Sequence, residues 1–211
     1  MKVKKENLRT MVCSIGKLIL YFVCVFGLTY LLVHFVGQRT VVIGDSMMGT
    51  LMDGDNIIVD KISYRFKEPE RFDIIAFPNG DNENYIKRII AMPGETVYID
   101  DAGAIFIDGA ELEESYGREV IKDAGLASVP VTLSTDEYFV LGDNRNNSMD
   151  SRDVSVGNVQ KKEIIGRALV RIYPFDKIKY FRYPKSHKRV TGHEQAAGRI
   201  ANACFTEKEW I

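Results

Sequence analysis

Three short segments of this sequence carry side chains that could do chemistry together. The first is residues 44–51 (GDSMMGTL), which places Ser46 on a turn flanked by glycines, directly after an apolar run. A serine in such a turn can expose both its hydroxyl and its backbone N–H. The hydroxyl is what an acyl-transfer nucleophile needs, and the N–H can stabilise the developing oxyanion. Serine beside glycine is more often an ordinary turn residue, so other segments must support this interpretation.

The second segment, residues 84–95 (NYIKRIIAMPGE), has a lysine inside a strand-like run. Strand alternation puts Tyr85, Lys87 and Ile89 on one face, so that Lys87 has apolar neighbours. Burial disfavours the charged amine and lowers its pKa, and a neutral lysine can act as a general base. The alternative is that the Lys87 side chain extends along the surface to reach solvent.

The third segment, residues 142–153 (GDNRNNSMDSRD), is dense with side chains that hydrogen-bond one another. Asp143, Asp150 and Asp153 offer oxygen ligands of the kind that calcium takes. Arg145 and Arg152 are interspersed among them and favour Asp–Arg pairs over a bound cation. We therefore expect a scaffold that orients catalytic groups, not a metal site.

The distribution of cysteine and histidine narrows the chemistry further. All of them lie outside residues 38–184, at Cys13, Cys24, Cys204, His34, His187 and His193. This excludes a cysteine nucleophile, a Ser-His-Asp triad and a His/Cys zinc site within that stretch. Hydrolysis there must use Ser, Thr, Lys, Tyr or carboxylates, and no metal or organic cofactor is implied.

The composition is that of a folded chain with no global charge bias. The 211 residues are 45% hydrophobic and 27% charged, with a formal net charge of −1. This length suits one domain plus an appendage. The absence of a basic field argues against a nucleic-acid partner.

The appendage is an apolar run at residues 18–36, nineteen positions without Asp, Glu, Lys or Arg. Its helical length of about 28 Å is just enough to cross a bilayer core. Basic residues gather before it, at Lys2, Lys4, Lys5, Arg9 and Lys17. The positive-inside rule predicts residues 1–17 in the cytoplasm and the rest outside the plasma membrane. A cleavable secretory signal is the alternative, but its core would be shorter and would end in a small-x-small site, which VGQR is not.

The elements that must position the three segments are short β-type runs separated by turn signals. We expect strands at residues 40–43, 56–60, 73–77, 85–91, 96–99, 104–107, 137–141 and 167–173. They predict a mainly β protein, with an antiparallel folded-sheet or barrel-like domain over residues 38–184. Residues 110–136 are more irregular and are interpreted as a small cap insertion. In the tail, residues 185–211, the apolar spacing is compatible with a short helix.

The anchor, the serine segment, the lysine strand and the polar loop, in this order, resemble type I signal peptidases. The likeness covers most of residues 15–180 and is closest to the single-anchor form of Gram-positive bacteria. It implies a membrane-bound serine endopeptidase that cleaves signal peptides from secretory precursors after a small-x-small motif. Its partners would be these precursors and the lipid bilayer, while the oligomeric state stays open.

The resemblance also implies roles for individual residues. Ser46 matches the nucleophile, Lys87 the general base and Ser148 a serine that hydrogen-bonds that lysine. Asp150 and Arg152 match an ion pair that shapes the site. Further scaffold positions correspond to Asp143 and Arg145, and the small-residue pockets to Met47, Leu51, Tyr85 and Ile86.

Two positions depart from the family pattern. The usual serine box reads Ser-Met-x-Pro-Thr, and Gly49 stands where proline is expected, which predicts a looser nucleophile loop. Gly44 stands where some relatives carry a serine, so the oxyanion hole would depend on backbone N–H groups, mainly that of Ser46. Neither change removes the Ser46–Lys87 dyad.

Two other function classes remain open at this stage. A non-catalytic relative could assist surface-protein or pilus assembly; Gly49 keeps this alternative, while intact Ser46 and Lys87 oppose it. A self-cleaving Ser/Lys regulator has a similar dyad, but the membrane segment and the lack of a basic DNA-binding patch argue against it.

Overall fold

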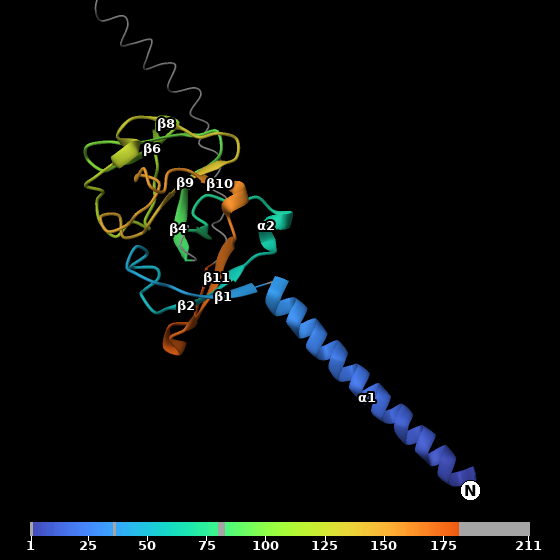
Figure 1. Cartoon of the computed structure of the whole chain (residues 1–211). Helices are drawn as coiled ribbons and strands as arrows, with labels where there is room; N and C mark the ends of the chain where they lie inside the picture. Colours follow the sequence, from blue (N-terminus) through green and yellow to red (C-terminus); the bar gives the residue numbers. More distant parts are fainter. Residues whose placement is uncertain (1, 36, 80–82, 182–211) are drawn as a thin grey trace, which may run out of the picture.

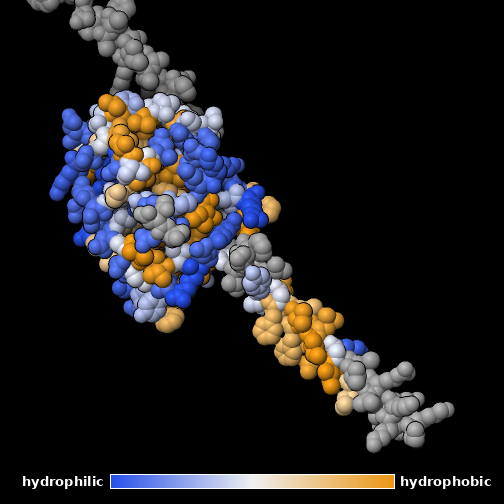
Figure 2. Space-filling view, in the orientation of Figure 1, coloured by the Kyte–Doolittle hydropathy of each residue, from blue (hydrophilic) through white to orange (hydrophobic). Residues whose placement is uncertain are grey.

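The computed structural model describes residues 2–35, 37–79 and 83–181, and shows a long helix leading into a β domain (Figure 1). Helix α1 (Lys2–Phe35) is exposed at every described position from residue 14 to residue 30. Apolar residues cover its middle (Figure 2). None of the helices in the described ranges combines the length and the hydropathy that crossing a membrane requires. The predicted tail helix in residues 185–211 lies outside the described residues.

The larger of two sheets has the strand order β1-β2-β11-β3-β4-β9-β10, with β12 added on β11, and its pairs are antiparallel. Its strands are β1 (Gly37–Val41), β2 (Asn56–Asp60), β3 (Ile74–Pro78), β4 (Asn84–Ala91), β9 (Glu137–Leu141), β10 (Val159–Gln160), β11 (Gly166–Tyr173) and β12 (Lys179–Tyr180). The predicted mainly β, antiparallel class is confirmed.

The smaller sheet has the order β7-β6-β5-β8. Its strands are β5 (Thr96–Ile99), β6 (Ile105–Ile107), β7 (Ala110–Glu111) and β8 (Val131–Thr132). The stretch interpreted as a cap, residues 110–136, therefore contributes two strands to this sheet. Short helices occur at α2 (Ser63–Phe66), η1 (Gly125–Ser128), η2 (Lys161–Glu163) and η3 (Phe175–Lys177).

Strand β3 shows why the central strands read as continuous apolar runs. Ile74 and Ala76 pack in one cluster with Met47, whereas Ile75 and Phe77 pack in another. Since successive side chains point to opposite faces, both faces of the sheet are buried at β3. The first cluster lies beneath the serine segment and supports it.

The first strand corrects a sequence-based prediction. It was expected at residues 40–43 but spans Gly37–Val41, so the expected bounds were shifted toward the C-terminus. The chain leaves the ladder at Val42, whose N–H donates to the Asp55 carbonyl at 2.8 Å and whose carbonyl accepts from the Gly54 N–H at 2.9 Å. Val42 is 3% exposed and packs under the loop. Its apolar character therefore reflects this core and not a strand.

Candidate active site

Ser46 and Lys87 meet although they lie on different elements. Lys87 Nζ donates to Ser46 Oγ at 2.7 Å. Ser46 sits on the turn that follows β1, and Lys87 is in the middle of β4. Both line one open hollow of about 460 Å³.

The predicted pocket residues do not all reach this hollow. Met47, Tyr85 and Ile86 line it together with the dyad. Leu51 is fully buried in the cluster beneath the serine segment and is not among the lining residues.

Lys87 is buried, with 2% of its surface exposed, so the alternative in which it reaches solvent is wrong. Its Nζ lies 5.2 Å from the centre of the Tyr85 ring. Burial lowers the pKa of Lys87 from 10.5 to about 8, while the charges of Asp150 and Asp143 partly oppose this shift. The lowered pKa raises the neutral fraction of Lys87 near neutral pH far above that of an exposed lysine, and the neutral amine is the form that a general base requires.

The loop that carries Ser46 depends on two glycines with positive φ. Gly44 has φ +84° and Gly49 has φ +104°. The Met47 carbonyl accepts from the N–H of Thr50, the residue after Gly49, at 3.0 Å. Proline is locked near φ −65° and cannot adopt the conformation of Gly49. Glycine at position 49 therefore fits the conformation that this loop adopts, and proline does not.

The backbone around Ser46 leaves one polar group available. Within the described ranges, the Ser46 N–H makes no backbone hydrogen bond, whereas the Ser46 carbonyl accepts from the Asn144 N–H at 3.0 Å. The Asn144 side-chain amide also donates to the Asp45 carbonyl at 3.0 Å. Asn144 therefore fastens the polar loop to the serine turn, a role that the sequence analysis did not assign.

Asp150 and Arg152 form the expected Asp–Arg pair. The guanidinium donates from Nε to Asp150 Oδ1 at 2.8 Å and from Nη2 to Oδ2 at 2.9 Å. Asp150 Oδ2 also accepts from the Gly142 N–H at 3.0 Å. Arg152 Nη1 donates to the Asp123 carbonyl at 3.0 Å, which ties the loop to residues 110–136.

Asp143 and Arg145 do not pair with each other. Asp143 accepts from Arg88 at 2.8 and 2.6 Å, and Arg145 forms an ion pair with Glu114 at 2.7 Å. The Arg88 guanidinium also lies 3.8 Å from the centre of the Tyr116 ring. Arginines therefore engage both Asp143 and Asp150, as expected from the arginines interspersed in the loop.

Sequence reasoning missed Arg88, Glu114 and Tyr116. A charged residue next to Lys87 in an otherwise apolar strand was the only signal for Arg88. Glu114 and Tyr116 lie in an irregular segment that carries no comparable pattern.

The hydrogen bond that the family resemblance implies between Ser148 and Lys87 is not present. Ser148 lines the same hollow as Lys87, but its buried Oγ has no hydrogen-bond partner in the part of the chain that the structure describes. It packs against Gly142, where an added Cβ would collide with both Ser148 Oγ and the Ser46 carbonyl. The polar loop and the serine turn are therefore in direct contact.

Comparisons with known proteins point in one direction. A family model described as signal peptidase, peptidase S26, matches residues 15–173. Signal peptidase I of Leptolyngbya laminosa is 39% identical over 162 residues, covering 72% of this chain and 77% of that protein. Signal peptidase I S of Bacillus subtilis is 36% identical over 160 residues, covering 72% of this chain and 85% of that protein. A solved structure of a signal peptidase I from Enterococcus faecalis V583 is 33% identical and covers 48% of this chain and 97% of that chain, with a TM-score of 0.38.

Proposed function

Because the chain belongs to the signal peptidase family, peptidase S26, it is a serine endopeptidase that processes signal peptides, and we propose that Ser46 and Lys87 perform the cleavage. One observation carries this assignment: the 2.7 Å hydrogen bond from Lys87 to Ser46 Oγ in an open hollow. A buried amine with a pKa of about 8 supplies the base that histidine supplies elsewhere.

The proposed reaction has two halves. Neutral Lys87 accepts the Ser46 hydroxyl proton as Oγ attacks the carbonyl carbon of the scissile bond, and the Ser46 N–H stabilises the oxyanion. Protonated Lys87 then donates this proton to the leaving amine, which becomes the new N-terminus of the mature protein. Lys87 next takes a proton from a water molecule as its oxygen attacks the acyl carbon of the acyl-enzyme, and Lys87 returns this proton to Ser46 Oγ as the ester bond breaks. This releases the signal peptide and restores neutral Lys87 and the Ser46 hydroxyl.

The neighbouring residues have supporting roles in this proposal. The buried pairs Asp150–Arg152 and Asp143–Arg88 hold the polar loop against the dyad, and Arg145 holds the cap segment through Glu114. Ser148 offers its unpartnered hydroxyl to Lys87 when the lysine turns from Ser46.

The substrate side is lined by apolar residues. Met47, Tyr85 and Ile86 would contact the small residues before the cut, and Leu51 would support Met47 from below.

The chain would act at the plasma membrane, attached through residues 18–36. Supporting this are the absence of charged residues in that run, the exposure of its described side chains and the five basic residues before it. Residues 1–17 would lie in the cytoplasm, and residues 38–184, with the cap at 110–136, outside. Protease added to intact cells should remove the domain and spare residues 1–17; full protection of the domain contradicts this topology.

The dyad is tested with a precursor peptide that carries an Ala-x-Ala site. Detergent-solubilised wild type should cleave after the second Ala, and Ser46→Ala and Lys87→Ala should each lose this activity while keeping the circular dichroism of the wild type. Substantial cleavage by either folded variant overturns the assignment.

A further inference from the structure

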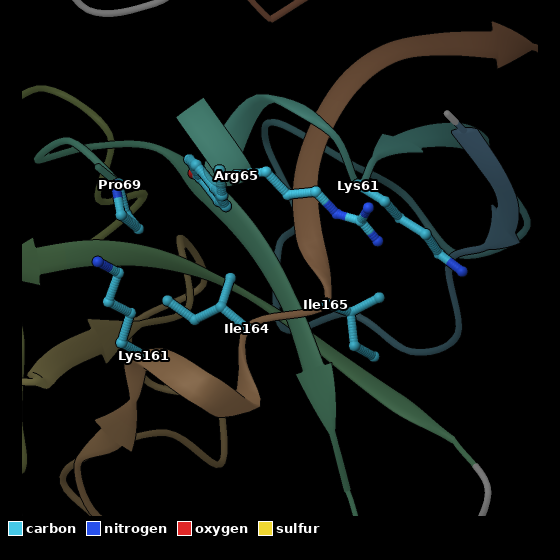
Figure 3. Close-up of a pocket in the computed structure, with 7 residues that line it drawn as sticks. Lys61, Arg65, Pro69, Lys161, Ile164 and Ile165 are labelled. Atoms are coloured by element: carbon cyan, nitrogen blue, oxygen red, sulfur yellow. The ribbon is translucent and has the colours of Figure 1, made fainter. Parts of the chain in front are cut away.

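A second hollow, of about 330 Å³, shares no lining residue with the one that holds the dyad. Figure 3 shows its lining residues. The hollow combines cationic with apolar lining. Its cationic lining residues are Lys61, Arg65 and Lys161, and its apolar ones include Pro69, Ile164 and Ile165. None of these was singled out as a candidate site residue from the sequence.

The strand register places this hollow at the end of the sheet nearest helix α1. In the strand register, Asp60 lies opposite Gly37, the first residue of β1, and on its other side opposite Arg167, near the start of β11. Lys61 follows Asp60 directly, and Ile165 precedes β11.

Ser46 lies beyond the opposite end of the same strand. It follows Val41, the last residue of β1, which pairs with Asn56 at the start of β2. The two hollows therefore flank opposite ends of β1 and are separate sites.

Two of the three cations have no ion-pair partner among the described residues. In the described part of the chain, neither the Lys61 nor the Arg65 side chain takes part in a hydrogen bond or ion pair, whereas Lys161 pairs with Glu68 at 2.5 Å. The Lys61 and Arg65 side chains extend in the same direction, away from Lys161 (Figure 3). Two parallel cations without an anion repel each other, and a bound anion would offset this repulsion.

Apolar side chains lie next to Lys61 and Arg65. Ile164 and Ile165 line the hollow, and Phe66, next to Arg65, is 83% exposed. The Tyr64 hydroxyl donates to Asp73 Oδ2 at 2.8 Å, so this side chain forms a fixed wall. A ligand that matches both parts has an anionic group joined to hydrocarbon.

We propose that this hollow binds the headgroup of an anionic membrane phospholipid. Lys61 and Arg65 contact the phosphate, and Ile164, Ile165 and Phe66 contact the hydrocarbon next to it. The proposal rests on the proposed attachment through residues 18–36, because that attachment puts lipid phosphates at the end of α1. The bound lipid would hold the β domain in one orientation on the bilayer.

The test uses the full chain in detergent, titrated with short-chain phosphatidylglycerol, short-chain phosphatidylcholine or inorganic phosphate. Hydrogen exchange is followed at residues 61–67 and 161–165. We expect protection by phosphatidylglycerol alone. Lys61→Gln with Arg65→Gln should weaken that binding about tenfold or more, at about 1 kcal/mol for each cation.

Lys177→Gln with Lys179→Gln is the matched control. Lys177 lies in η3 and Lys179 in β12. In the strand register, Lys179 is opposite Arg171 of β11, and Arg171 is in turn opposite Ile57, near the start of β2. They are therefore at the end of the sheet away from Asp60, and we expect this double variant to bind phosphatidylglycerol as the wild type does.

Three results would overturn the proposal: undiminished phosphatidylglycerol binding by the Lys61/Arg65 double variant, an equal loss in the control, or inorganic phosphate protecting as well as the lipid. Separate experiments show whether the proposed function itself fails. Peptide cleavage in detergent tests the dyad, and membrane sedimentation of the full chain tests the attachment. Neither depends on Lys61 or Arg65.

Discussion

Arg171 on β11 donates from Nη1 to Asp55 Oδ2 at 2.8 Å, and this pair closes the base of the loop that carries Ser46. The same Nη1 donates to the Thr50 carbonyl at 3.3 Å. Asp55 Oδ2 also accepts from the Met52 N–H at 2.9 Å. A side chain of the central sheet thus holds the second half of the loop that carries Ser46.

We expect Arg171→Gln to lower kcat about 10- to 100-fold with little change in KM, because small displacements of a reacting atom are costly. Arg171→Lys should recover part of this loss. Arg167→Gln is the matched control: Arg167 lies on the same strand and forms an ion pair with Asp73 at 2.8 Å that is more deeply buried than the Arg171–Asp55 pair and lies away from the loop. Steady-state kinetics on folded protein check this, and an equal fall of kcat in the control would show a general structural effect.

Activity should rise with pH through about 8. Only neutral Lys87 can accept the Ser46 proton, and its pKa is about 8, so kcat/KM should fall about tenfold for each pH unit below that value. The charge of Asp150 raises the pKa of Lys87, so Asp150→Asn should shift the profile to lower pH. Asp153→Asn, at an exposed position of the same loop, should leave it in place. A profile that is flat between pH 6 and 9 contradicts the role of Lys87.

Lys87→Met should be more stable than the wild type at pH 7, by about 3 kcal/mol, since burial depresses the pKa from 10.5 to about 8. Below pH 8 the lysine is protonated in both states, and its full burial penalty opposes folding. Between pH 8 and 10.5 the unfolded chain binds a proton that the folded chain does not, so wild-type stability rises with pH. Urea denaturation should show that the difference in unfolding free energy between Lys87→Met and the wild type becomes smaller from pH 8 to 10.5. A difference that stays constant over this range would contradict the prediction.

Restoring the family's proline should harm this protein. At φ +104°, Gly49→Pro must rebuild the loop and should lower kcat at least tenfold. Gly49→Ala should cost about 1–2 kcal/mol of stability and also reduce kcat. Gly109→Ala is the control: Gly109 has φ +79° and equally open surroundings, but it lies in the turn between β6 and β7 of the smaller sheet. This variant should lose stability and keep the wild-type kcat. Higher activity of Gly49→Pro would show that the loop prefers another conformation.

The ends of the longer strands could be predicted from the sequence where turn residues stand on both sides of a short apolar run. The bounds of β2, β5 and β9 match the expected ranges. The two-residue strands β7, β8, β10 and β12 were not expected, because two residues carry no periodicity and their pairing depends on the neighbouring strand.

The site could be predicted in part. The pairing of Asp150 with Arg152 follows from their proximity in sequence, whereas Asp143 offered Arg145 as the nearer partner and instead pairs with Arg88. That choice depends on how β4 lies beside β9, where Arg88 is opposite Leu141. Such cross-strand proximity is a property of the fold and cannot be read from a local segment.

Strand β1 also acts as a spacer between the helix and the site of cleavage. It joins α1 directly to the serine turn and spans about 17 Å at ~3.4 Å per residue. Pairing with β2 along its whole length keeps it from shortening or bending. In a chain attached to a bilayer through α1, the cut is made at a set distance from the end of the helix. Precursors would then be selected by length as well as by the residues before the cut. The length of chain between a precursor's own apolar segment and the bond to be cleaved must match this spacing.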